Sequence, residues 1–444
     1  KSKIKFYKDN VFFKKILISW PQIFGTSTIS CSREILYKFF KKGKPFCWNY
    51  LAIDIKLILF AHTQFDLISL QKKLTMKRIH NANLDKTFSN LISISFWKRR
   101  KMQIEYDFFL KKKNVLNLDY IITKIKEHSI DSDFDCIMGM SGGIDSSYLL
   151  YIMVEKFGLR PLVFHVDAGW NTQIAVNNIE KLVDSLDLDL YTEVINWEEI
   201  KDLQLSFFKS GVPHIDVPQD HAFFAMMYKF ASNNNINYIL TGGNYSTECI
   251  RNPIEWMYYQ SDSVQLKDIQ NKFGTIPLIS YPMTSILWHK FYLPYVKGIK
   301  TIRPLDYVPY NKEKASNLLV KKFGFQKYPQ KHFESRFTRF YESYWLVQRF
   351  GFDTRKVQFS SLILSGQMTR EQALEELDKP AYSSGTINHE IEFVANKLDI
   401  STEELMSYMH LRKKTYKDYK SQNLIYNLGA KVLKFLGIEK GGKR

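Results

Sequence analysis

The sequence contains little cysteine. Its 444 residues include only Cys31, Cys47, Cys136 and Cys249. These four are too few and too scattered for a disulfide framework, so we expect a reducing compartment, the cytoplasm. No CxxC pair is present, and the sequence therefore predicts no zinc site.

Long apolar runs are absent too. A membrane-spanning helix needs roughly 18 apolar residues. The best candidate, residues 51–62, is short and is interrupted by Asp54 and Lys56. The sequence therefore predicts no membrane span.

Acidic residues are scarce only near the N-terminus. Residues 1–100 contain 20 basic and 5 acidic residues, whereas the remaining chain contains 43 basic and 40 acidic ones. The net charge of +18 therefore belongs mostly to one segment. The rest of the chain is nearly balanced, so a nucleic-acid partner is not expected for it.

Residues 1–104 match no usual pattern of a folded domain. Neither the helical nor the strand period persists in them, and Lys, Phe, Ile, Leu, Ser and Asn dominate their composition. One interpretation is a basic arm that binds nucleic acid or a membrane surface. The other is an artefact of the reading frame or start site, because AT-rich DNA read in an unselected frame encodes Lys, Phe, Ile and Asn. The segment is therefore unassigned.

From about residue 105 the sequence alternates short apolar runs with amphipathic segments. The runs at 135–140, 161–166, 191–195 and 238–241 predict buried strands, and the segments between them predict helices. This order is typical of an α/β fold with a doubly wound parallel sheet, which binds ligands beyond the carboxyl ends of its strands. We expect this domain over residues 105–309 and a mainly helical C-terminal domain over residues 310–444.

The strongest chemical signal is the string Ser-Gly-Gly-Ile-Asp-Ser-Ser at residues 141–147. It joins a predicted strand to a predicted helix, where backbone amides and the helix dipole favour a bound phosphate. It is neither a GxxxxGK Walker loop nor a GxGxxG loop. The expected phosphate ligands are Ser141, Gly142, Gly143, Ser146 and Ser147. Asp145 cannot favour a phosphate directly, so we expect it to bind Mg²⁺ or to cap the helix.

The SGGxDS pattern resembles the PP-loop of ATP pyrophosphatases, a group with a Rossmann-like fold. Further segments at 165–171, 241–248, 303–306, 331–341, 350–353 and 360–370 narrow the likeness. Together, and above all through the string KHFESRFTRF, they resemble the N-acetyl sugar amidotransferase family of the WbpG and PseA type over roughly residues 112–430. That family acts in lipopolysaccharide O-antigen and flagellin-sugar biosynthesis. Relatives usually begin with CxxC pairs, which Cys31 and Cys47 do not match.

The resemblance implies a reaction. An acetamido group on a free or nucleotide-linked sugar would become an acetamidino group through an adenylated intermediate, with ATP and Mg²⁺ as cofactors. The sequence contains no GxCxG nucleophile elbow, so ammonia would come from solution or from a partner. The partners implied by the resemblance are a HisH-like glutaminase and a HisF-like ammonia-channel protein.

The resemblance also assigns candidate residues. His165, Asp167, Gly242 and Gly243 are expected beside ATP, and Asp145 is the expected magnesium ligand. Asp167 can instead cap a loop, and the two glycines can instead form a turn.

Residues 331–341 supply the other catalytic candidates, which are Lys331, His332, Glu334 and Arg336. The two basic side chains suit phosphate charge, and His332 or Glu334 suits proton transfer from ammonia. The same spacing also fits a solvated helix face with its aromatic side chains packed inward.

Two other functions stay open. A PP-loop enzyme that modifies tRNA would share the loop, although the balanced charge of residues 101–444 and the missing CxxC pair argue against it. The other alternative is a nucleotide-binding scaffold without activity.

Overall fold

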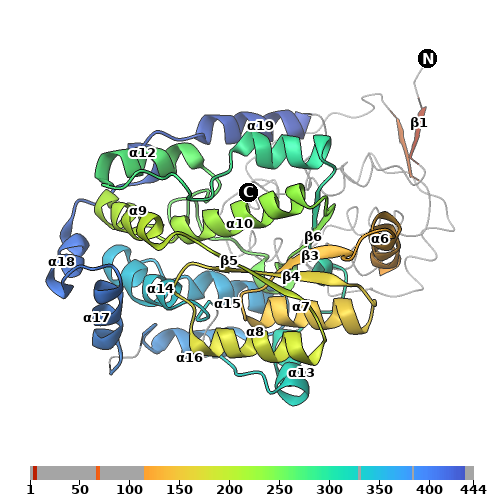
Figure 1. Ribbon diagram of the computed structural model, residues 1–444, viewed down its shortest axis with the longest axis horizontal. Coiled ribbons are helices and arrows are strands. Elements are labelled where there is room, and N and C mark those ends of the chain that lie inside the picture. The colour runs from red at the N-terminus through yellow and green to blue at the C-terminus, as the bar shows by residue number, and fades with distance from the viewer. Residues whose placement is uncertain (1–3, 8–66, 71–114, 329–331, 383–384, 436–444) are drawn as a thin grey trace, which may run out of the picture. The chain divides into compact units, whose positions relative to one another are not determined.

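The computed structural model describes residues 4–7, 67–70, 115–328, 332–382 and 385–435 (Figure 1). The chain divides into two compact units, one of Lys1–Leu110 with Asn423–Arg444 and one of Lys111–Gln422. The first includes the antiparallel strands β1 (Ile4–Tyr7) and β2 (Leu67–Leu70) and helix α19 (Asn423–Phe435). Most of the unassigned basic segment lies outside the described residues. Within the described ranges, no helix is long and apolar enough to cross a membrane.

A five-stranded parallel sheet forms the centre of the second unit. Its strands are β3 (Cys136–Gly139), β4 (Pro161–Asp167), β5 (Leu190–Val194), β6 (Tyr238–Leu240) and β7 (Lys300–Ile302). They are arranged in the order β5-β4-β3-β6-β7, and every pairing is parallel. The chain moves outward from β3 to β5 and then crosses back to β6 and β7. The predicted doubly wound sheet is therefore confirmed, and its switch point lies between β3 and β6.

Both faces of the central strands β3 and β4 are buried. The strand predicted as buried at 191–195 is instead largely exposed, because β5 is the edge strand of the sheet. In β3, Cys136 and Met138 belong to one hydrophobic cluster and Ile137 to the other. In β4, Val163 and Phe164 divide between the same two clusters. Because neither face meets water, these strands are encoded as continuous apolar runs and not as an alternation of apolar and polar residues.

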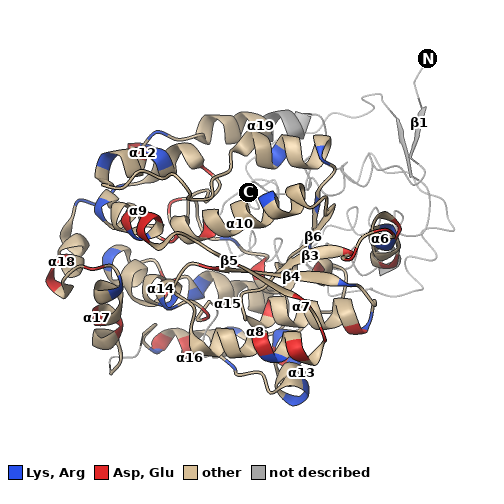
Figure 2. Ribbon diagram, in the orientation of Figure 1, with Lys and Arg blue, Asp and Glu red and all other residues tan. Residues whose placement is uncertain are grey.

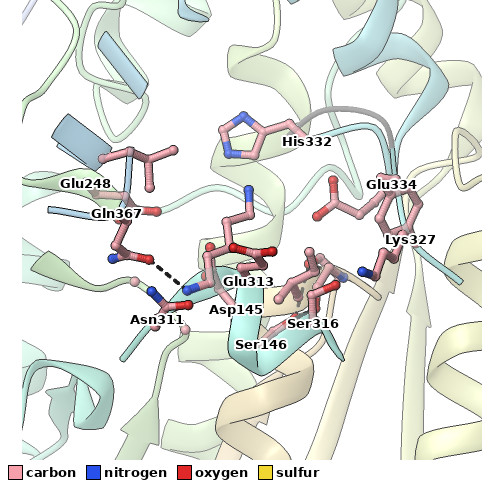
Figure 3. Close-up of a pocket in the computed structure, with 18 of the residues that line it drawn as sticks. Asp145, Ser146, Glu248, Asn311, Glu313, Ser316, Lys327, His332, Glu334 and Gln367 are labelled. Carbon is pink, nitrogen blue, oxygen red and sulfur yellow. Dashed lines mark hydrogen bonds between the residues drawn. The ribbon is translucent and has the colours of Figure 1, made fainter. Parts of the chain in front are cut away.

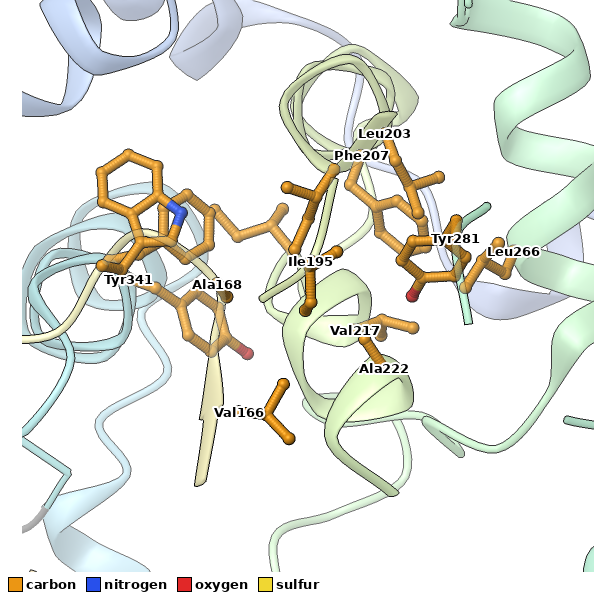
Figure 4. Close-up of a cluster of buried hydrophobic side chains, with 14 of the residues drawn as sticks. Val166, Ala168, Ile195, Leu203, Phe207, Val217, Ala222, Leu266, Tyr281 and Tyr341 are labelled. Carbon is orange, nitrogen blue, oxygen red and sulfur yellow. The ribbon is translucent and has the colours of Figure 1, made fainter. Parts of the chain in front are cut away.

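Helices cover the two faces (Figure 1). On one side lie α9 (Trp197–Ser210), α10 (Val217–Asn233) and α12 (Ser263–Phe273), and on the other lie α7 (Ile144–Glu155), α8 (Gln173–Ser185) and α13 (Lys312–Phe323). Two further helices are α6 (Val115–His128) and the short α11 (Tyr245–Glu248). Figure 4 shows the cluster on the α9 side, where Leu203 and Phe207 pack with Leu266 of α12 and with Tyr281.

Side-chain caps explain where several of these helices begin. Oxygen atoms of Thr172, Asn196, Asp262 and Asn311 accept hydrogen bonds from backbone amides at the starts of α8, α9, α12 and α13. These amides have no partner inside their helices, so each cap satisfies a donor that would otherwise be lost.

The C-terminal part is mainly helical, as predicted. Its helices are α14 (Arg336–Phe340), the π-helix η4 (Tyr341–Phe350), α15 (Arg355–Leu364), α16 (Arg370–Asp378), α17 (Ile387–Lys397) and α18 (Thr402–Ser407). Shorter or irregular segments are η2 (Trp288–Val296), η3 (Pro304–Asp306), η5 (Tyr408–His410) and η6 (Tyr416–Asp418). Phe337 and Trp345 pack edge-on against Phe208 of α9. Residues on both sides of the expected boundary at 309/310 thus belong to one compact unit.

Charged residues of both signs lie mainly on the helices. Figure 2 shows blue and red residues interspersed along α7, α8 and α13, while the strands of the sheet are mostly tan. This distribution matches the balanced charge of the sequence after residue 100.

Buried carboxylates of α9 hold the segment that follows α12. Asp202 accepts hydrogen bonds from the Thr275 hydroxyl at 2.7 Å and from the Ile276 amide at 2.9 Å. Glu199 accepts one from the Ser280 amide at 2.8 Å. Burial alone raises the pKa of Asp202, but the hydrogen bonds outweigh burial and hold that pKa below its usual range. The folded state therefore stabilises the charged form of Asp202.

We predict that Asp202→Ala lowers the thermal unfolding midpoint by several degrees at pH 7. The variant leaves buried amides without an acceptor, which costs about 2–4 kcal/mol. Because the pKa of Asp202 is depressed on folding, its contribution is present above the usual carboxyl pKa and is lost as the pH falls through the lower, folded value. Calorimetry from pH 7 down to pH 3 should show the difference from wild type shrinking. The exposed Asp184→Asn is the control, and an equal loss there would contradict the assignment.

Candidate functional site

A cavity of about 500 Å³ opens at the switch point of the sheet, beyond the ends of β3 and β6. This size suits a small-molecule ligand. In Figure 3, Glu334 and Lys327 lie on one side of the space and Gln367 and Asn311 on the other. The lining residues are Gly139, Ser141, Gly143, Ile144, Asp145, Ser146, Gly242, Gly243, Glu248, Asn311, Lys312, Glu313, Ser316, Lys327, Tyr328, His332, Glu334, Leu362 and Gln367.

The SGG loop forms the floor of this cavity and leads into α7. The Gly143 amide donates to Ser141 Oγ at 3.2 Å, and Ser146 Oγ donates to the Gly143 carbonyl at 3.2 Å. The two serine hydroxyls lie 3.3 Å apart. Hydroxyl groups and the amide-bearing start of a helix thus face one space, which is an arrangement that binds anions.

Two glycines of the site have no room for a side chain. A Cβ on Gly242 would lie 2.8 Å from the Ser146 backbone nitrogen, and one on Gly142 would lie 2.7 Å from the Ala175 carbonyl oxygen. Gly142 also has a φ of +78°, which side-chain-bearing residues rarely adopt. The segment that follows β6 can therefore approach the first turn of α7 only because position 242 is a glycine.

Two tyrosines hold the loop from distant segments. The Tyr310 hydroxyl donates to Asp145, and the Tyr328 hydroxyl donates to the Gly142 carbonyl at 3.1 Å. Asn178 of α8 in turn donates to Tyr328 at 3.3 Å. Burial, followed by the charge of Asp145, raises the pKa of Tyr310 far above its usual value. Tyr310 is therefore a hydrogen-bond donor to Asp145 throughout the neutral pH range.

Carboxylates and amines share the cavity. Asp145, Glu248, Glu313 and Glu334 line it together with Lys312 and Lys327. Arg303 lies behind Glu248, with 3.9 Å between Nη2 and Oε2. A triphosphate in this space would meet four carboxylates, so a cation has to lie between them.

The lining fits a nucleoside triphosphate that carries Mg²⁺. Mg²⁺ is usually held by one or two carboxylates and by phosphate oxygens of the substrate. In the described ranges no group of three or more His, Cys, Asp or Glu side chains is gathered closely enough to hold a metal. The nucleotide would therefore have to supply much of the coordination, with Asp145 as the candidate protein ligand.

The structure brings most of the predicted site residues to this cavity. Those that line it are Ser141, Gly143, Asp145, Ser146, Gly242, Gly243, His332 and Glu334. Gly142 supports the loop through its carbonyl. Ser147 is fully buried behind the loop, and its hydroxyl has no hydrogen-bond partner. Lys331 lies outside the described residues.

His165 and Asp167 lie in the last residues of β4, hydrogen bond to the loop that follows it, and do not line the cavity. His165 hydrogen bonds through Nδ1 to the Met140 carbonyl at 2.8 Å and through Nε2 to Asn171 at 2.9 Å. Asp167 accepts from the Gly169 amide at 2.7 Å and from Asn171 at 3.0 Å. These are the contacts of a loop cap, the other interpretation that the sequence allows for Asp167.

Arg336 is also held away from the cavity lining. Its Nη2 donates to Glu390 at 2.8 Å, and its guanidinium lies 3.3 Å from the centre of the Phe393 ring. Both partners belong to α17, so Arg336 connects two C-terminal helices in this structure. Its expected contact with phosphate stays a prediction.

Several residues of the site were not predicted from the sequence. Lys312, Lys327, Tyr328 and Gln367 line the cavity from α13 and the segments after it. Tyr310 reaches the site through its hydrogen bond to Asp145. No spacing motif connects them to the SGG loop, and position 310 coincides with the expected domain boundary. The one local signal in this region is Asn311, a helix cap that places Lys312 at the start of α13.

Comparison with known proteins agrees with this picture. Residues 334–433 match a family described as the C-terminal domain of LPS biosynthesis protein WbpG-like proteins. The NH(3)-dependent NAD(+) synthetase of Methanococcoides burtonii is 27% identical over 105 residues, which are 23% of this chain and 36% of that protein. The chain thus spans about a third of the length of this curated relative.

Solved structures give weaker likenesses. NMN synthetase from Francisella tularensis shows 16% identity and a TM-score of 0.29, over 66% of this chain and 97% of that one. The NH3-dependent NAD synthetase from Campylobacter jejuni shows 13% identity and a TM-score of 0.27, over 64% and 93%. TM-scores this low support no argument about the fold. The fold is established by the strand order described above. The chain thus has a segment, residues 334–433, that is similar to the C-terminal domain of WbpG-like proteins, beside an SGG loop that resembles a PP-loop.

Proposed function

We propose that this protein is an ATP-dependent amidotransferase that converts an acetamido group of a sugar to an acetamidino group in surface-polysaccharide biosynthesis. One observation carries the proposal. Glu334, the first residue of the WbpG-like match, lies so close to the SGG loop that a Cβ on Gly143 would be 1.9 Å from its carboxylate. The WbpG-like segment and the SGG loop therefore line the same cavity.

The proposed reaction has two steps. In the first, the amide oxygen of the acetamido group attacks the α-phosphorus of ATP, the bond to the β-phosphate breaks, and pyrophosphate leaves. In the second, ammonia adds to the activated amide carbon, and AMP leaves with the former amide oxygen. The amidine product takes up one proton and is a cation at neutral pH.

The residues of the cavity suit the first step. The amides that open α7, with Ser141 and Ser146, would hold the departing pyrophosphate. Mg²⁺ offsets the phosphate charge when it is bound. Asp145 is oriented for such a cation by the Tyr310 hydroxyl, and Lys312 and Lys327 add positive charge to the lining.

The second step needs an ammonia nucleophile and a proton acceptor. His332 and Glu334 line the cavity and are our candidates for the proton transfer. Lys331 and Arg336 would support the charge of the nucleotide from the same segment. A HisH-like glutaminase with a HisF-like channel protein is the proposed source of ammonia, and the cytoplasm is the proposed location.

We predict that the protein forms AMP and pyrophosphate from ATP only when a suitable sugar is present. The test is to incubate the full chain with ATP, Mg²⁺, ammonium and a panel of diacetamido sugars, both free and linked to UDP or CMP. With nitrogen-15 ammonium, mass spectrometry should find one label in the sugar product. ADP as the product, or AMP with an unlabelled sugar, would contradict the proposed reaction.

We further predict that Asp145→Asn lowers the rate of sugar-dependent AMP formation by at least about 100-fold, because the site loses a charge that Mg²⁺ requires. Tyr310→Phe should lower it by about tenfold, since Asp145 then loses one hydrogen bond that orients it. The control is Tyr191→Phe, whose hydroxyl bonds Glu193 on the edge strand β5. A wild-type rate in Asp145→Asn would exclude this carboxylate from the site.

A further inference from the structure

An exposed apolar stripe runs along the π-helix η2, which precedes β7. Backbone hydrogen bonds of a π-helix join residues five apart, so side chains four or five positions apart lie on the same side of it. Five large apolar side chains follow this spacing, and between 38% and 68% of each is exposed: Leu287, Phe291, Tyr292, Tyr295 and Val296. The rings of Phe291 and Tyr295 lie 5.6 Å apart. We call this stripe the η2 face.

The opposite side of η2 packs on the protein. Leu293 is 2% exposed, and Trp288 packs against the same hydrophobic cluster on the α9 side. The His289 ring lies 4.5 Å from the ring of Tyr228 on α10. The helix is therefore apolar on two sides, of which one meets the core and the other is exposed. A helix that is apolar all round is typical of a fully buried position.

Single exposed apolar residues are common on protein surfaces, whereas a contiguous set marks a contact with another molecule or with a membrane. The five side chains of the η2 face belong to one helix and to one side of it. None of them lines the cavity described above. The face is therefore a second surface, and the proposed reaction leaves it without a role.

Positive charge borders the η2 face. Lys290 lies five positions before Tyr295, and Lys297 lies five positions after Tyr292, whose carbonyl accepts from the Lys297 amide at 3.0 Å. Each of these two exposed lysines thus lies beside a tyrosine of the face. Residues 269–305 contain no Asp or Glu, but they contain Lys272, Lys290, Lys297, Lys300 and Arg303. An apolar stripe bordered by lysines is typical of helices that lie in the surface of an anionic bilayer.

We propose that the η2 face binds the surface of an anionic lipid bilayer. The nine residues of η2 are too few to cross a bilayer, which takes about 20, so the helix would lie along it. Tyrosine rings suit the boundary between headgroups and acyl chains, because they are apolar with one polar end. Lysine stems lie along apolar surface while their ammonium groups reach lipid phosphates. This contact is independent of the reaction proposed above.

Charge separates the bilayer from other occupants of the η2 face. A second copy of the chain would bring the same lysines together across a symmetric interface, where they repel each other. The basic segment before residue 101 would meet like charge as well. A protein partner fits less well, because protein interfaces are depleted of lysine. Anionic phospholipid supplies both the opposite charge and the apolar medium.

Binding through the η2 face leaves the cavity open. The helix leads into the amino end of β7, the edge strand of the sheet. The cavity lies beyond the carboxyl ends of β3 and β6. In a parallel sheet, the amino ends and the carboxyl ends of the strands lie at opposite edges. The proposed contact would therefore hold the protein on a bilayer by the end of the sheet that is remote from the cavity.

The first test measures binding of the full-length protein to vesicles by flotation. Wild type should float with phosphatidylcholine vesicles that contain about a quarter phosphatidylglycerol, and at least about tenfold less of it should float with phosphatidylcholine alone. Phe291→Ser combined with Tyr295→Ser should lower the partition coefficient at least about tenfold, because two rings no longer enter the bilayer boundary. Lys290→Glu combined with Lys297→Glu should lower it as much, because the headgroups then meet like charge.

Matched control variants carry the same changes elsewhere. Leu374→Ser with Leu411→Ser alters leucines that are 49% and 40% exposed, and Lys321→Glu with Lys413→Glu alters exposed lysines. Both control proteins should float as wild type does. An equal loss in the controls would overturn the proposal, and so would a wild type that does not float. If the η2 variants float as wild type does, the bilayer is bound by another segment and the η2 face is excluded.

Hydrogen exchange locates the contact. Vesicles with phosphatidylglycerol should slow exchange in peptides that cover residues 286–297 and leave peptides of α16 unchanged. Unchanged exchange over 286–297 would overturn the proposal. Sedimentation without vesicles tests the second copy as the occupant. A dimer that forms with rising concentration and is lost in the Phe291→Ser and Tyr295→Ser protein would overturn the bilayer in favour of an interface between copies.

Discussion

The site depends on one contact between two backbones. At the switch point the end of β6 lies against the first turn of α7, and a Cβ on Gly242 would come within 2.8 Å of the Ser146 nitrogen. This approach fixes the opening amides of α7 at the edge of the cavity. Because the opening amides of a helix lack partners within it, this geometry suits an anion between β3 and β6. Every other group in the cavity is positioned around that opening.

Negative charge surrounds an opening that attracts anions. Four carboxylates line the cavity with the SGG loop. Such an arrangement is stable only when cations or hydrogen-bond donors lie between the charges. The tyrosines provide part of this, since Tyr310 donates to Asp145 from a segment 165 residues away. A magnesium nucleotide in the cavity would provide the rest.

Hydrogen-bond partners in the folded chain also explain which site predictions the structure places elsewhere. His165 and Asp167 lie at the end of β4 in the position expected for nucleotide ligands, yet Asn171 hydrogen bonds to both of them. Arg336 stands in the family-specific string, yet Glu390, 54 residues later, accepts its hydrogen bond. A residue's type and spacing show what it can bind. Its partner in the folded chain decides what remains available to a ligand.

The sequence by itself missed β7 but determined four of the five strands of the parallel sheet and the SGG loop. Both depend on features within a few residues, namely apolar runs whose two faces are buried and glycines next to a helix start. Only the tertiary structure decided which polar groups meet the loop. Tyr310 and Tyr328 reach the loop from segments more than 100 residues away in the chain. Their positions follow from how the helices pack on the two faces of the sheet, and no local pattern encodes that packing.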